Sequence, residues 1–286
     1  MIKAAAGGGG RGIRIAQDPD EFARYFPQAS SEARAAFGDG GLYVEKVIER
    51  ARHVEVQILG DGARFVHCYE RECSLQRRRQ KVWEEAPAFG LDPTVREAMC
   101  RSAVALAAEV GYRGAGTVEY LYDDATHEFY FIEVNTRIQV EHPVTEMVTG
   151  IDLVETMIRI AGGEPLALQQ EAIALHGHAI ECRINAEDPT RNFMPGPGTI
   201  ARLDVPDDPE IRFDTLLYAG YAVPPFYDSL LGKLIVHGRD RTDCLVRLRR
   251  ALNLFRIDGV PTTLALHRSL ADDADVIAGR VDTRFL

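Results

Sequence analysis

The sequence predicts an α+β fold in which most strands are antiparallel. Two observations favour this class. A pair of β-rich runs joined by a short polar turn is typical of a hairpin, and a later series of strand-like segments is divided by proline-rich turns. The chain has 286 residues, of which 46% are hydrophobic and 27% are charged. This is the composition of a globular protein, and the length suits one large domain or two ordinary ones.

The first sixty residues predict strands on either side of a helix. Residues 1–3 read as the end of a strand, and 18–37 as a helix that Pro27 is expected to break or kink. Residues 42–46 form a short candidate strand. In 53–60 hydrophobic residues alternate with polar ones, which is typical of a strand whose two faces differ.

The middle of the chain predicts a loop, two helices and a hairpin. Residues 72–85 are charged and have no clear period, which favours a loop. Asp92 and Pro93 supply an N-cap and a proline at the first helical position, and the helix should run to about Val110. The other elements are a hairpin made of 115–122 and 128–134, and an amphipathic helix at 151–161 closed by two glycines.

The stretch 164–176 is the best internal boundary of the chain, because the pattern of elements changes after it. The segments that follow are strand-like at 177–184, 198–203 and 234–237, and helical near 242–255.

Charge and composition exclude several classes of protein. Lys and Arg total 33 against 43 Asp and Glu, which gives a net charge of −10 and argues against a nucleic-acid partner. No apolar stretch approaches the roughly 20 residues of a membrane helix, and the first residues lack the pattern of a signal peptide. The five cysteines form no CxxC pair, so neither a disulfide framework nor a zinc site is favoured. These features predict a cytoplasmic protein without a membrane partner.

Lys3 and the glycines of 7–12 form a candidate phosphate-binding loop. Glycines let backbone N–H groups approach an anion, and the lysine adds a point charge. A flexible linker is an equally good interpretation of the glycines alone, and the loop lacks the pattern of a Walker motif. Because only three residues precede the stretch 4–12 that contains these glycines, we expect the chain to begin inside a domain and to lack the strands before it.

The segment 133–141 carries the most informative pattern. Its odd positions are all polar, whereas its even positions are Val, Thr, Ile and Val. In an extended chain the polar groups would follow one face at intervals of roughly 6–7 Å. The five groups are those of Glu133, Asn135, Arg137, Gln139 and Glu141. An amphipathic edge strand would alternate in the same way, but five different functional groups favour a surface that lines a substrate.

Glu119 lies in the strand that precedes 128–134 in the predicted hairpin. Pairing of the two strands could bring Glu119 beside Glu133, with Asn135 just beyond. Two carboxylates and an amide oxygen are hard ligands that suit Mg²⁺ between a protein and nucleotide phosphates. The alternative is an exposed acidic pair, which would repel unless a cation lay between the two carboxylates.

Two basic features complete the set of candidates. The run 76–81 has four cations and indicates an anion site, although a solvated charged segment is the ordinary interpretation of such a run. Arg183 should point to one face of the strand at 177–184. Taken alone, it is better interpreted as an ion-pair partner than as a catalytic group.

Together these segments resemble biotin carboxylase, the ATP-grasp subunit or domain of biotin-dependent carboxylases. The resemblance covers essentially the whole chain, and its long central motif is highly specific. The matching segments are Lys3 with the glycine loop, VEK at 44–46, HVEVQ at 53–57, ERECSLQRR at 70–78, GYRGAGT at 111–117, FIEVNTRIQVEHPVTE at 131–146, ECRINAEDP at 181–189, YAGY at 218–221 and YDSLLGK at 227–233.

The resemblance implies a fold and a reaction. The fold is an ATP-grasp fold with an incomplete lid subdomain at 1–47 and a catalytic core at 48–170, followed by a biotin carboxylase carboxy-terminal domain at 175–286. In the implied reaction, ATP and bicarbonate give carboxyphosphate, whose CO₂ passes to N1 of biotin on a carrier. The cofactors would be ATP, Mg²⁺ or Mn²⁺, and carrier-bound biotin.

The resemblance also implies roles for individual residues. These roles are phosphate binding by Lys3, Gly9 and Gly10; adenine binding by Glu45, Lys46 and Ile48; contact with the ribose or other parts of the nucleotide by His53, Gln76, Arg79 and Leu121; metal binding by Glu119, Glu133 and Asn135; bicarbonate binding by Lys81, Arg137, Gln139 and the backbone of Val140; deprotonation of bicarbonate by Glu141; and stabilisation of the biotin enolate by Arg183.

Several features depart from the family pattern. The resemblance leads us to expect that the amino-terminal domain of the family is missing. Arg79 stands where the family often has His, and Trp83 stands where a small aliphatic residue is usual. No Met-Lys-Met biotinylation site occurs, so the biotin carrier is expected on another chain or a lost domain. A carboxyltransferase would be the other partner, and the resemblance implies a homodimer in the intact family member.

Three functions remain open on the sequence. The first is an ATP-dependent ligase of the biotin carboxylase type, present as an amino-terminally truncated piece. The second is a non-catalytic remnant or interaction module. The third is an ATP-grasp ligase that activates another carboxylate; it would share the metal residues, but it would not need Arg137, Gln139 and Glu141 in this register.

Overall fold

The structure is a computed structural model that describes residues 1–7 and 12–286. Its described residues divide into two compact units, Met1–Glu49 and Arg50–Leu286.

The first unit is a small antiparallel sheet with one helix. Its strands are β1 (Ile2–Ala4), β2 (Ile13–Arg14) and β3 (Leu42–Val44), in the order β2-β1-β3. Helix α1 (Pro19–Phe37) begins after Asp18, whose side chain accepts a hydrogen bond from the backbone N–H of Glu21.

Helix α1 ends at Gly38, whose φ of 79° is the left-handed conformation that a glycine accepts without strain. The predicted break at Pro27 is wrong, because α1 continues through this residue. The caps at both ends, together with burial of Ala29 and Ala33, hold both halves of the helix despite the backbone hydrogen bond that the proline cannot donate.

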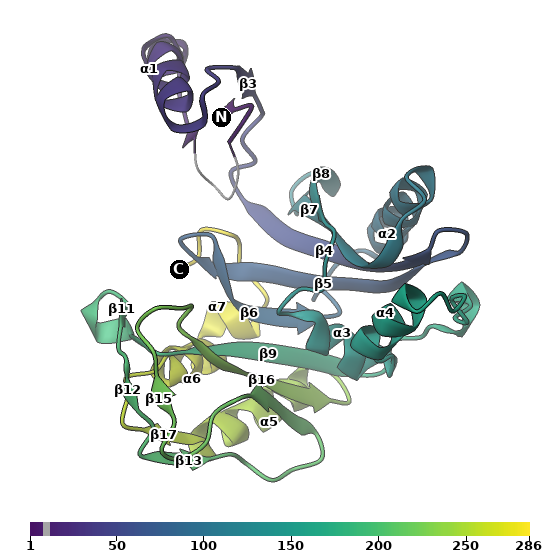
Figure 1. The fold of residues 1–286 in the computed structure, drawn as a ribbon, viewed down its shortest axis with the longest axis vertical. Helices are drawn as coiled ribbons and strands as arrows, with labels where there is room; N and C mark the ends of the chain where they lie inside the picture. The colour runs from purple at the N-terminus through teal and green to yellow at the C-terminus, as the bar shows by residue number, and fades with distance from the viewer. Residues whose placement is uncertain (8–11) are drawn as a thin grey trace. The chain divides into compact units, whose positions relative to one another are not determined.

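The second unit is built on one sheet of eight strands in which all neighbours are antiparallel (Figure 1). The mostly antiparallel α+β class predicted from the sequence is confirmed. In spatial order the strands are β14 (Ile211–Thr215), β16 (Leu230–Gly238), β9 (His178–Asn185), β6 (Gln80–Ala86), β5 (Phe65–Arg77), β4 (Ala51–Asp61), β7 (Arg113–Asp123) and β8 (Glu128–Asn135).

The prediction of a loop at 72–85 is wrong. This stretch contains the end of β5 and most of β6, which are joined by a turn at Arg78 and Arg79, both with positive φ. Strands β5 and β6 lie in the middle of the sheet and are covered on both faces. Their charged side chains therefore have partners on either side, and no hydrophobic alternation marks them as strands.

The expectation of an extended chain over 133–141 holds only for its first three residues. Strand β8 ends at Asn135, and 136–141 is an irregular segment that leads into helix α3 (His142–Thr149). We call 136–141 the crossing loop. Its polar alternation therefore reflects the direction of individual side chains in a loop rather than one face of a strand.

Other expectations are confirmed. Helix α2 (Pro93–Glu109) begins after Asp92, whose carboxylate accepts hydrogen bonds from two backbone N–H groups. Strands β7 and β8 form the predicted hairpin, and Glu119 pairs with Glu133 in its register. The predicted amphipathic helix is α4 (Leu153–Ala161), with Gly162 at its carboxyl end.

The two faces of the sheet are covered by different helices. Val54, Val56 and Val118 pack with α2, and Ile180 and Leu234 pack with α5 (Arg241–Leu254). The residues that alternate with these along each strand point to the other face of the sheet, where Ala179 and Ile235 pack with α3. We call the first side the helix face and the second the cavity face. Figure 1 shows α5 and α3 with β9 between them.

The remaining elements follow β9 or connect α4 to it. The short strands are β10 (Glu187–Asp188), β11 (Met194–Pro195), β12 (Gly198–Thr199), β13 (Arg202–Asp204), β15 (Ala222–Val223) and β17 (Arg256–Asp258); the helices are α6 (Leu264–Asp272), α7 (Ala274–Ile277) and the 3₁₀ turns Gln170–Ala172 and Pro189–Arg191. The eight-stranded sheet joins residues from 48–170 and 175–286, because β6 pairs with β9. The division at 164–176 stays a prediction.

Candidate active site

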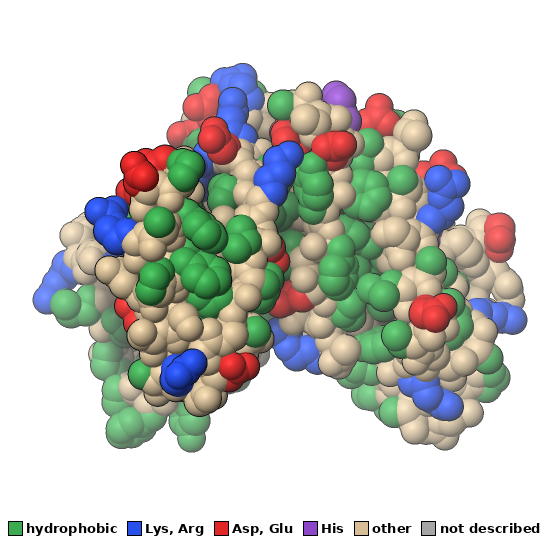
Figure 2. All heavy atoms as spheres, turned by 90° about the horizontal axis from the view of Figure 1, so that it is seen from above, with side chains coloured by type: hydrophobic (Ala, Val, Ile, Leu, Met, Phe, Trp, Pro, Cys, Tyr) green, Lys and Arg blue, Asp and Glu red, His purple; other side chains and the backbone are tan. Residues whose placement is uncertain are grey.

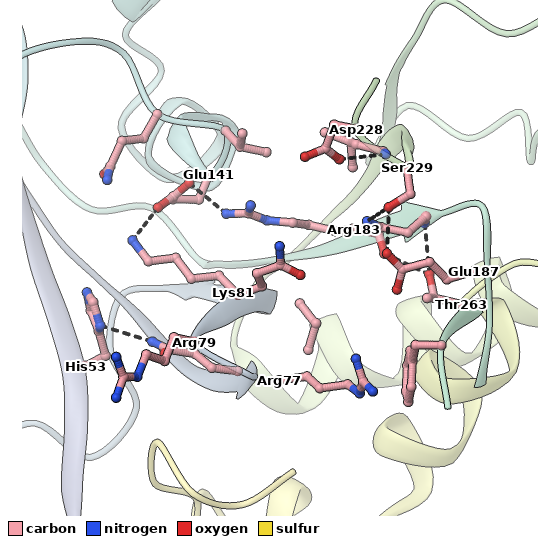
Figure 3. Close-up of a pocket in the computed structure, with 18 of the residues that line it drawn as sticks. His53, Arg77, Arg79, Lys81, Glu141, Arg183, Glu187, Asp228, Ser229 and Thr263 are labelled. Carbon is pink, nitrogen blue, oxygen red and sulfur yellow. Dashed lines mark hydrogen bonds and ion pairs between the residues drawn. The ribbon is translucent and has the colours of Figure 1, made fainter. Parts of the chain in front are cut away.

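A cavity of about 380 Å³ opens on the cavity face of the sheet in the second unit. It is lined by side chains from β4 to β9, by the crossing loop and by segments near the carboxyl end (Figure 3). The lining residues are His53, Gln76, Arg77, Arg79, Gln80, Lys81, Val82, Glu119, Glu133, Asn135, Arg137, Gln139, Val140, Glu141, Arg183, Asn185, Glu187, Phe193, Asp228, Ser229, Leu230 and Thr263.

Lys81 lies at the centre of the acidic side chains of this cavity. Its Nζ donates to Glu55 Oε2 at 2.5 Å, to Glu141 Oε1 at 2.6 Å and to Glu119 Oε1 at 2.9 Å. Burial alone would lower the pKa of Lys81, but the three carboxylates outweigh burial and raise it. Lys81 is therefore a fixed positive charge in the cavity.

Arg71 lies behind Lys81 and holds the polar side chains of the cavity face together. It is fully buried, and it donates to Glu55 Oε1 at 2.5 Å. Its other acceptors are Gln57 Oε1 at 2.8 Å, Gln139 Oε1 at 2.9 Å, Thr117 Oγ1 at 3.1 Å and Thr145 Oγ1 at 3.1 Å. Arg71 thus connects β4, β7, the crossing loop and α3, and it fixes Gln139 at the cavity wall.

Glu119 is the acceptor on which several donors converge. Its Oε1 accepts from Lys81, from Gln139 Nε2 at 2.9 Å and from Asn135 Nδ2 at 3.1 Å. Its Oε2 lies 3.2 Å from His53 Nε2. Burial would raise the pKa of Glu119, but the hydrogen bond with His53 and the charges of His53 and Lys81 hold it at about 2.

Glu119, Glu133 and Asn135 also satisfy the chemistry of a magnesium site. Glu119 and Glu133 are directly paired on β7 and β8, and Asn135 Nδ2 lies 3.1 Å from Glu119 Oε1 and 3.5 Å from Glu133 Oε1. Asn135 Oδ1 accepts a hydrogen bond from Arg137 Nη2 at 3.2 Å, so the amide oxygen would have to exchange this donor for a metal ion. This donor set fits a hard divalent cation.

Glu141 lies between two cations from different strands (Figure 3). Its Oε1 accepts from Lys81, and its Oε2 accepts from Arg183 Nη2 at 2.9 Å. Arg183 also donates from Nε to Glu84 Oε1 at 2.6 Å, so its guanidinium bridges two carboxylates. Glu141 is 2% exposed, and the two cations replace the water that a buried carboxylate loses.

The backbone beside Glu141 is held by Lys233. Lys233 Nζ donates to the carbonyl oxygen of Val140 at 3.0 Å and lies 3.3 Å from Asp214 Oδ2. Lys233 is on β16, where it pairs with Arg183 of β9. Strand β16 therefore fixes the orientation of the peptide that joins Val140 to Glu141.

The structure brings most of the predicted site residues of the second unit to one cavity. The residues predicted to act on bicarbonate and biotin all line it, as do the three predicted metal ligands and His53, Gln76 and Arg79. Leu121 is not among the lining residues; it pairs with His53 in the register of β4 and β7. These roles stay predictions.

The other predicted nucleotide-binding residues belong to the first unit or lie outside the described residues. Lys3 on β1 forms an ion pair with Glu45, which follows β3, and its Nζ lies 5.9 Å from the ring centroid of Tyr43. Lys46 and Ile48 also belong to this unit. Gly9 and Gly10 lie outside the described residues.

Sequence reasoning missed the residues that hold the cavity together, above all Glu55, Arg71, Glu84 and Lys233. Glu55 had a detectable signal, because it lies on the polar side of the alternating run 53–60. Arg71 lies just before the stretch interpreted as a loop and Glu84 lies within it, so no direction could be given to their side chains. The departure at Trp83 lies on the helix face, where Trp83 is 1% exposed and donates to Glu85 Oε1 at 3.0 Å.

The described surface carries charges of both signs. On the face that Figure 2 presents, Lys and Arg side chains lie among Asp and Glu side chains, with hydrophobic side chains between them. Among the helices that the structure describes, none combines the length and the apolar character needed to cross a membrane.

Family models match both parts of the chain. Residues 1–169 match the ATP-binding domain of the carbamoyl-phosphate synthase L chain, and 181–286 match the biotin carboxylase C-terminal domain. The chain is 53% identical to a biotin carboxylase of Nostoc sp. strain PCC 7120, covering 100% of this chain and 64% of the relative. It is 54% identical to a chloroplastic biotin carboxylase of Arabidopsis thaliana, covering 100% of this chain and 53% of the relative.

Solved structures of biotin carboxylases have the same fold. The complex of Campylobacter jejuni biotin carboxylase with beta-gamma-ATP has a TM-score of 0.92 and 46% identity, covering 99% of this chain and 63% of that one. The biotin carboxylase domain dimer of Hydrogenobacter thermophilus 2-oxoglutarate carboxylase, with MgADP, ADP and bicarbonate, has a TM-score of 0.91 and 48% identity, covering 100% of this chain and 63% of that one. This chain thus spans between half and two thirds of the length of these relatives, and it belongs to the biotin carboxylase family.

Proposed function

We propose that this chain carries out ATP- and bicarbonate-dependent carboxylation of biotin through carboxyphosphate. The observation that carries the proposal is the position of Glu141, a buried carboxylate between Lys81 and Arg183, beside a set of hard metal ligands. Membership of the biotin carboxylase family supports the same assignment, because a related domain binds MgADP and bicarbonate.

The first step is deprotonation of bicarbonate by Glu141. Bicarbonate would be held by Lys81, Arg137, Gln139 and the backbone N–H of Val140. Its O–H proton passes to Glu141, and an oxygen of the resulting carbonate attacks the γ-phosphorus of ATP. The bond between that phosphorus and the β–γ bridging oxygen breaks, which gives carboxyphosphate and ADP. Lys81 supports this step electrostatically, because its fixed charge favours the doubly charged nucleophile.

Glu119, Glu133 and Asn135 would hold Mg²⁺ at the nucleotide phosphates. When bound, the metal neutralises charge that develops during phosphoryl transfer. The protein orients its ligands through the donors around Glu119, since Lys81 and Gln139 fix that carboxylate in one position. Mn²⁺ has the same ligand preference and could replace Mg²⁺.

The proposal also assigns contacts with the nucleotide to individual residues. The proposal assigns the ribose and its surroundings to His53, Gln76, Arg79 and Leu121; the adenine to Glu45, Lys46 and Ile48; and the phosphates to Lys3, Gly9 and Gly10. The hydrogen bond of 3.0 Å between Gln76 Nε2 and His53 Nδ1 supports a joint role for these two side chains.

In the second step the bond between the carboxyl carbon and the phosphate oxygen of carboxyphosphate breaks, which gives CO₂ and phosphate. The N1 proton of biotin passes to this phosphate, and N1 of the resulting enolate, which Arg183 would stabilise, bonds to CO₂. The partners in the proposal are a biotin carrier, a carboxyltransferase and a second copy of this chain. A related biotin carboxylase domain forms a dimer, which supports the last of these. The proposal keeps the division into 1–47, 48–170 and 175–286, and a cytoplasmic location in agreement with five buried, free cysteines.

The test is ADP release from Mg-ATP by the purified chain, measured with and without bicarbonate and with free biotin. The proposal expects ADP release that depends on bicarbonate in the chain and is lost in E141Q. Nucleotide binding without bicarbonate-dependent ADP release, in a chain shown by circular dichroism to be folded, would contradict the proposal and favour a non-catalytic module.

A further inference from the structure

Two glutamates face one another in the interior of the sheet, beside the cavity but outside its lining. Glu84 of β6 and Glu181 of β9 are directly paired in the register of the two strands, and each is 0% exposed. Directly paired residues on neighbouring antiparallel strands have their Cβ atoms about 5 Å apart. Two charged carboxylates at this separation and without water destabilise one another, so the pair needs either a cation or a proton.

The contacts of the pair identify its charged member. Glu84 Oε1 accepts a hydrogen bond from Arg183 Nε at 2.6 Å, so Glu84 has a cation. Glu84 Oε2 and both carboxyl oxygens of Glu181 are buried without a hydrogen-bond partner. A proton on Glu181 supplies the donor that the pair lacks, and it removes the second negative charge.

The groups around the pair favour the same distribution of charge, with Glu84 as the charged member and Glu181 as the protonated one. The charged groups that face it are Arg183 of β9, Lys81 of β6, Glu141 of the crossing loop and Lys233 of β16. Burial, followed by the neighbouring charge of Glu84, raises the pKa of Glu181 well above its usual value. Burial also raises the pKa of Glu84, to about 7, although Arg183 acts against burial.

We infer that Glu84 is a positioning residue that holds the guanidinium of Arg183 in the cavity, and that Glu181 stays protonated as its neutral partner. The inference rests on the proposed function for its catalytic consequence only. With Nε bound to Glu84, Arg183 presents Nη2 to Glu141 at 2.9 Å, and the guanidinium is shared between the two carboxylates.

The consequence is that the positive charge of Arg183 is shared between Glu84 and Glu141, so the predicted base Glu141 is not its sole partner. Arg183 would otherwise form its ion pair with Glu141 alone, and the guanidinium would turn away from an incoming substrate. Glu84 anchors the guanidinium at Nε, while Arg183 still lines the cavity. Loss of the proton from Glu84 strengthens this anchor, so catalysis that uses Arg183 should rise as the pH passes through about 7.

The first experiment does not require turnover. Carboxyl carbons of ¹³C-labelled glutamates are followed by NMR from pH 5 to 9 in the chain, in E84Q and in E181Q. We expect one resonance that titrates near pH 7 and disappears in E84Q. In E181Q the midpoint of this resonance should stay within about half a unit, because glutamine resembles the neutral acid. A resonance that titrates below pH 7 and disappears in E181Q, which would show that Glu181 ionises, or a fall of the Glu84 midpoint by more than one unit in E181Q, would overturn the inference.

The second experiment measures ADP release in the presence of bicarbonate and free biotin across the same pH range. We expect kcat to fall about tenfold in E84Q, with KM for ATP within twofold and without the rise near pH 7. The matched control is E97Q on the exposed side of α2, which should keep both kcat and the pH profile. An unchanged kcat and pH profile in E84Q overturns the positioning role. An inactive wild-type chain contradicts the proposed function instead, and the NMR result then decides the inference.

Discussion

Glu84 and Glu85 are neighbours on β6, yet the two faces of the sheet treat them in opposite ways. Glu85 points to the helix face, where it accepts hydrogen bonds from Arg241 at 2.7 Å, His178 at 2.9 Å and Trp83 at 3.0 Å. Burial would raise the pKa of Glu85, but His178 and Arg241 hold it well below its usual value. Glu84 points to the cavity face, where it has Arg183 and faces a second glutamate.

The difference separates structural charges from functional ones. On the helix face Arg241 forms a bidentate pair with one carboxylate, that of Glu85, and this pair is closed within the protein. On the cavity face Lys81 and Arg183 are each shared among carboxylates, and both line the cavity. A shared cation can reorganise when a substrate arrives, whereas a closed pair cannot. Buried charge alone therefore does not mark a site; a cation that is shared among several carboxylates beside a cavity does.

The largest effect is expected for Glu141 on the cavity face. Glu141→Ala removes the proposed base, so bicarbonate-dependent ADP release should fall at least about 100-fold, the usual range for loss of general base catalysis. The affinity for nucleotide should stay within about threefold. Both are measured on one preparation, by a coupled ADP assay and by calorimetric titration. Loss of nucleotide binding together with turnover would count against this role.

Removal of a buried charge on the helix face should lower the stability of the fold rather than the rate of the reaction. Arg241→Ala leaves Glu85 buried without its bidentate partner, so the free energy of unfolding should fall by about 3 kcal/mol. Urea denaturation monitored by the fluorescence of Trp83 measures this change. The activity per folded molecule should remain within about twofold. A large loss of activity at unchanged stability would remove the distinction between the two faces.

The raised pKa of Glu84 predicts a pH dependence of stability. Because the folded-state pKa of about 7 exceeds the ordinary 4.5, the folded chain binds more protons than the unfolded chain between these values. The stabilisation is therefore fully present below about pH 4.5 and is lost as the pH rises through about 7. The loss should reach about 3 kcal/mol relative to E84Q. Urea denaturation of both chains at pH 5 and pH 8 measures it; parallel curves would show that Glu84 titrates normally.

The smallest effect is expected for Lys233, which acts on the cavity through a backbone carbonyl. Lys233→Gln weakens the charge-assisted hydrogen bond to Val140, worth about 1.5 kcal/mol, so KM for bicarbonate should rise about tenfold with little change in KM for ATP. Lys233→Arg should restore part of the affinity. Equal changes in both KM values would indicate a general loss of structure instead of a local change at Val140.

The sequence predicted best where a local pattern has one physical meaning. Asp92 followed by Pro93 specified the start of α2, and the turn between 115–122 and 128–134 specified a hairpin whose register brought Glu119 to Glu133. It failed where a pattern has more than one meaning. The charged stretch 72–85 is part of two central strands, and the alternation of 133–141 continues through a loop. Charged residues next to one another on a central strand show no periodicity when both faces supply partners.

The sequence by itself determined the α+β class, the family and the short-range parts of the site, because caps, turns and hairpin pairing act between residues close in the chain. Only the tertiary structure decided which buried cations pair with a single carboxylate and which are shared among several carboxylates. Glu84 meets Glu181 and Arg183 from almost one hundred positions away, and Lys233 reaches Val140 from 93 positions away. Such partners are set by the order of strands in the sheet, and the pKa of each group follows from them.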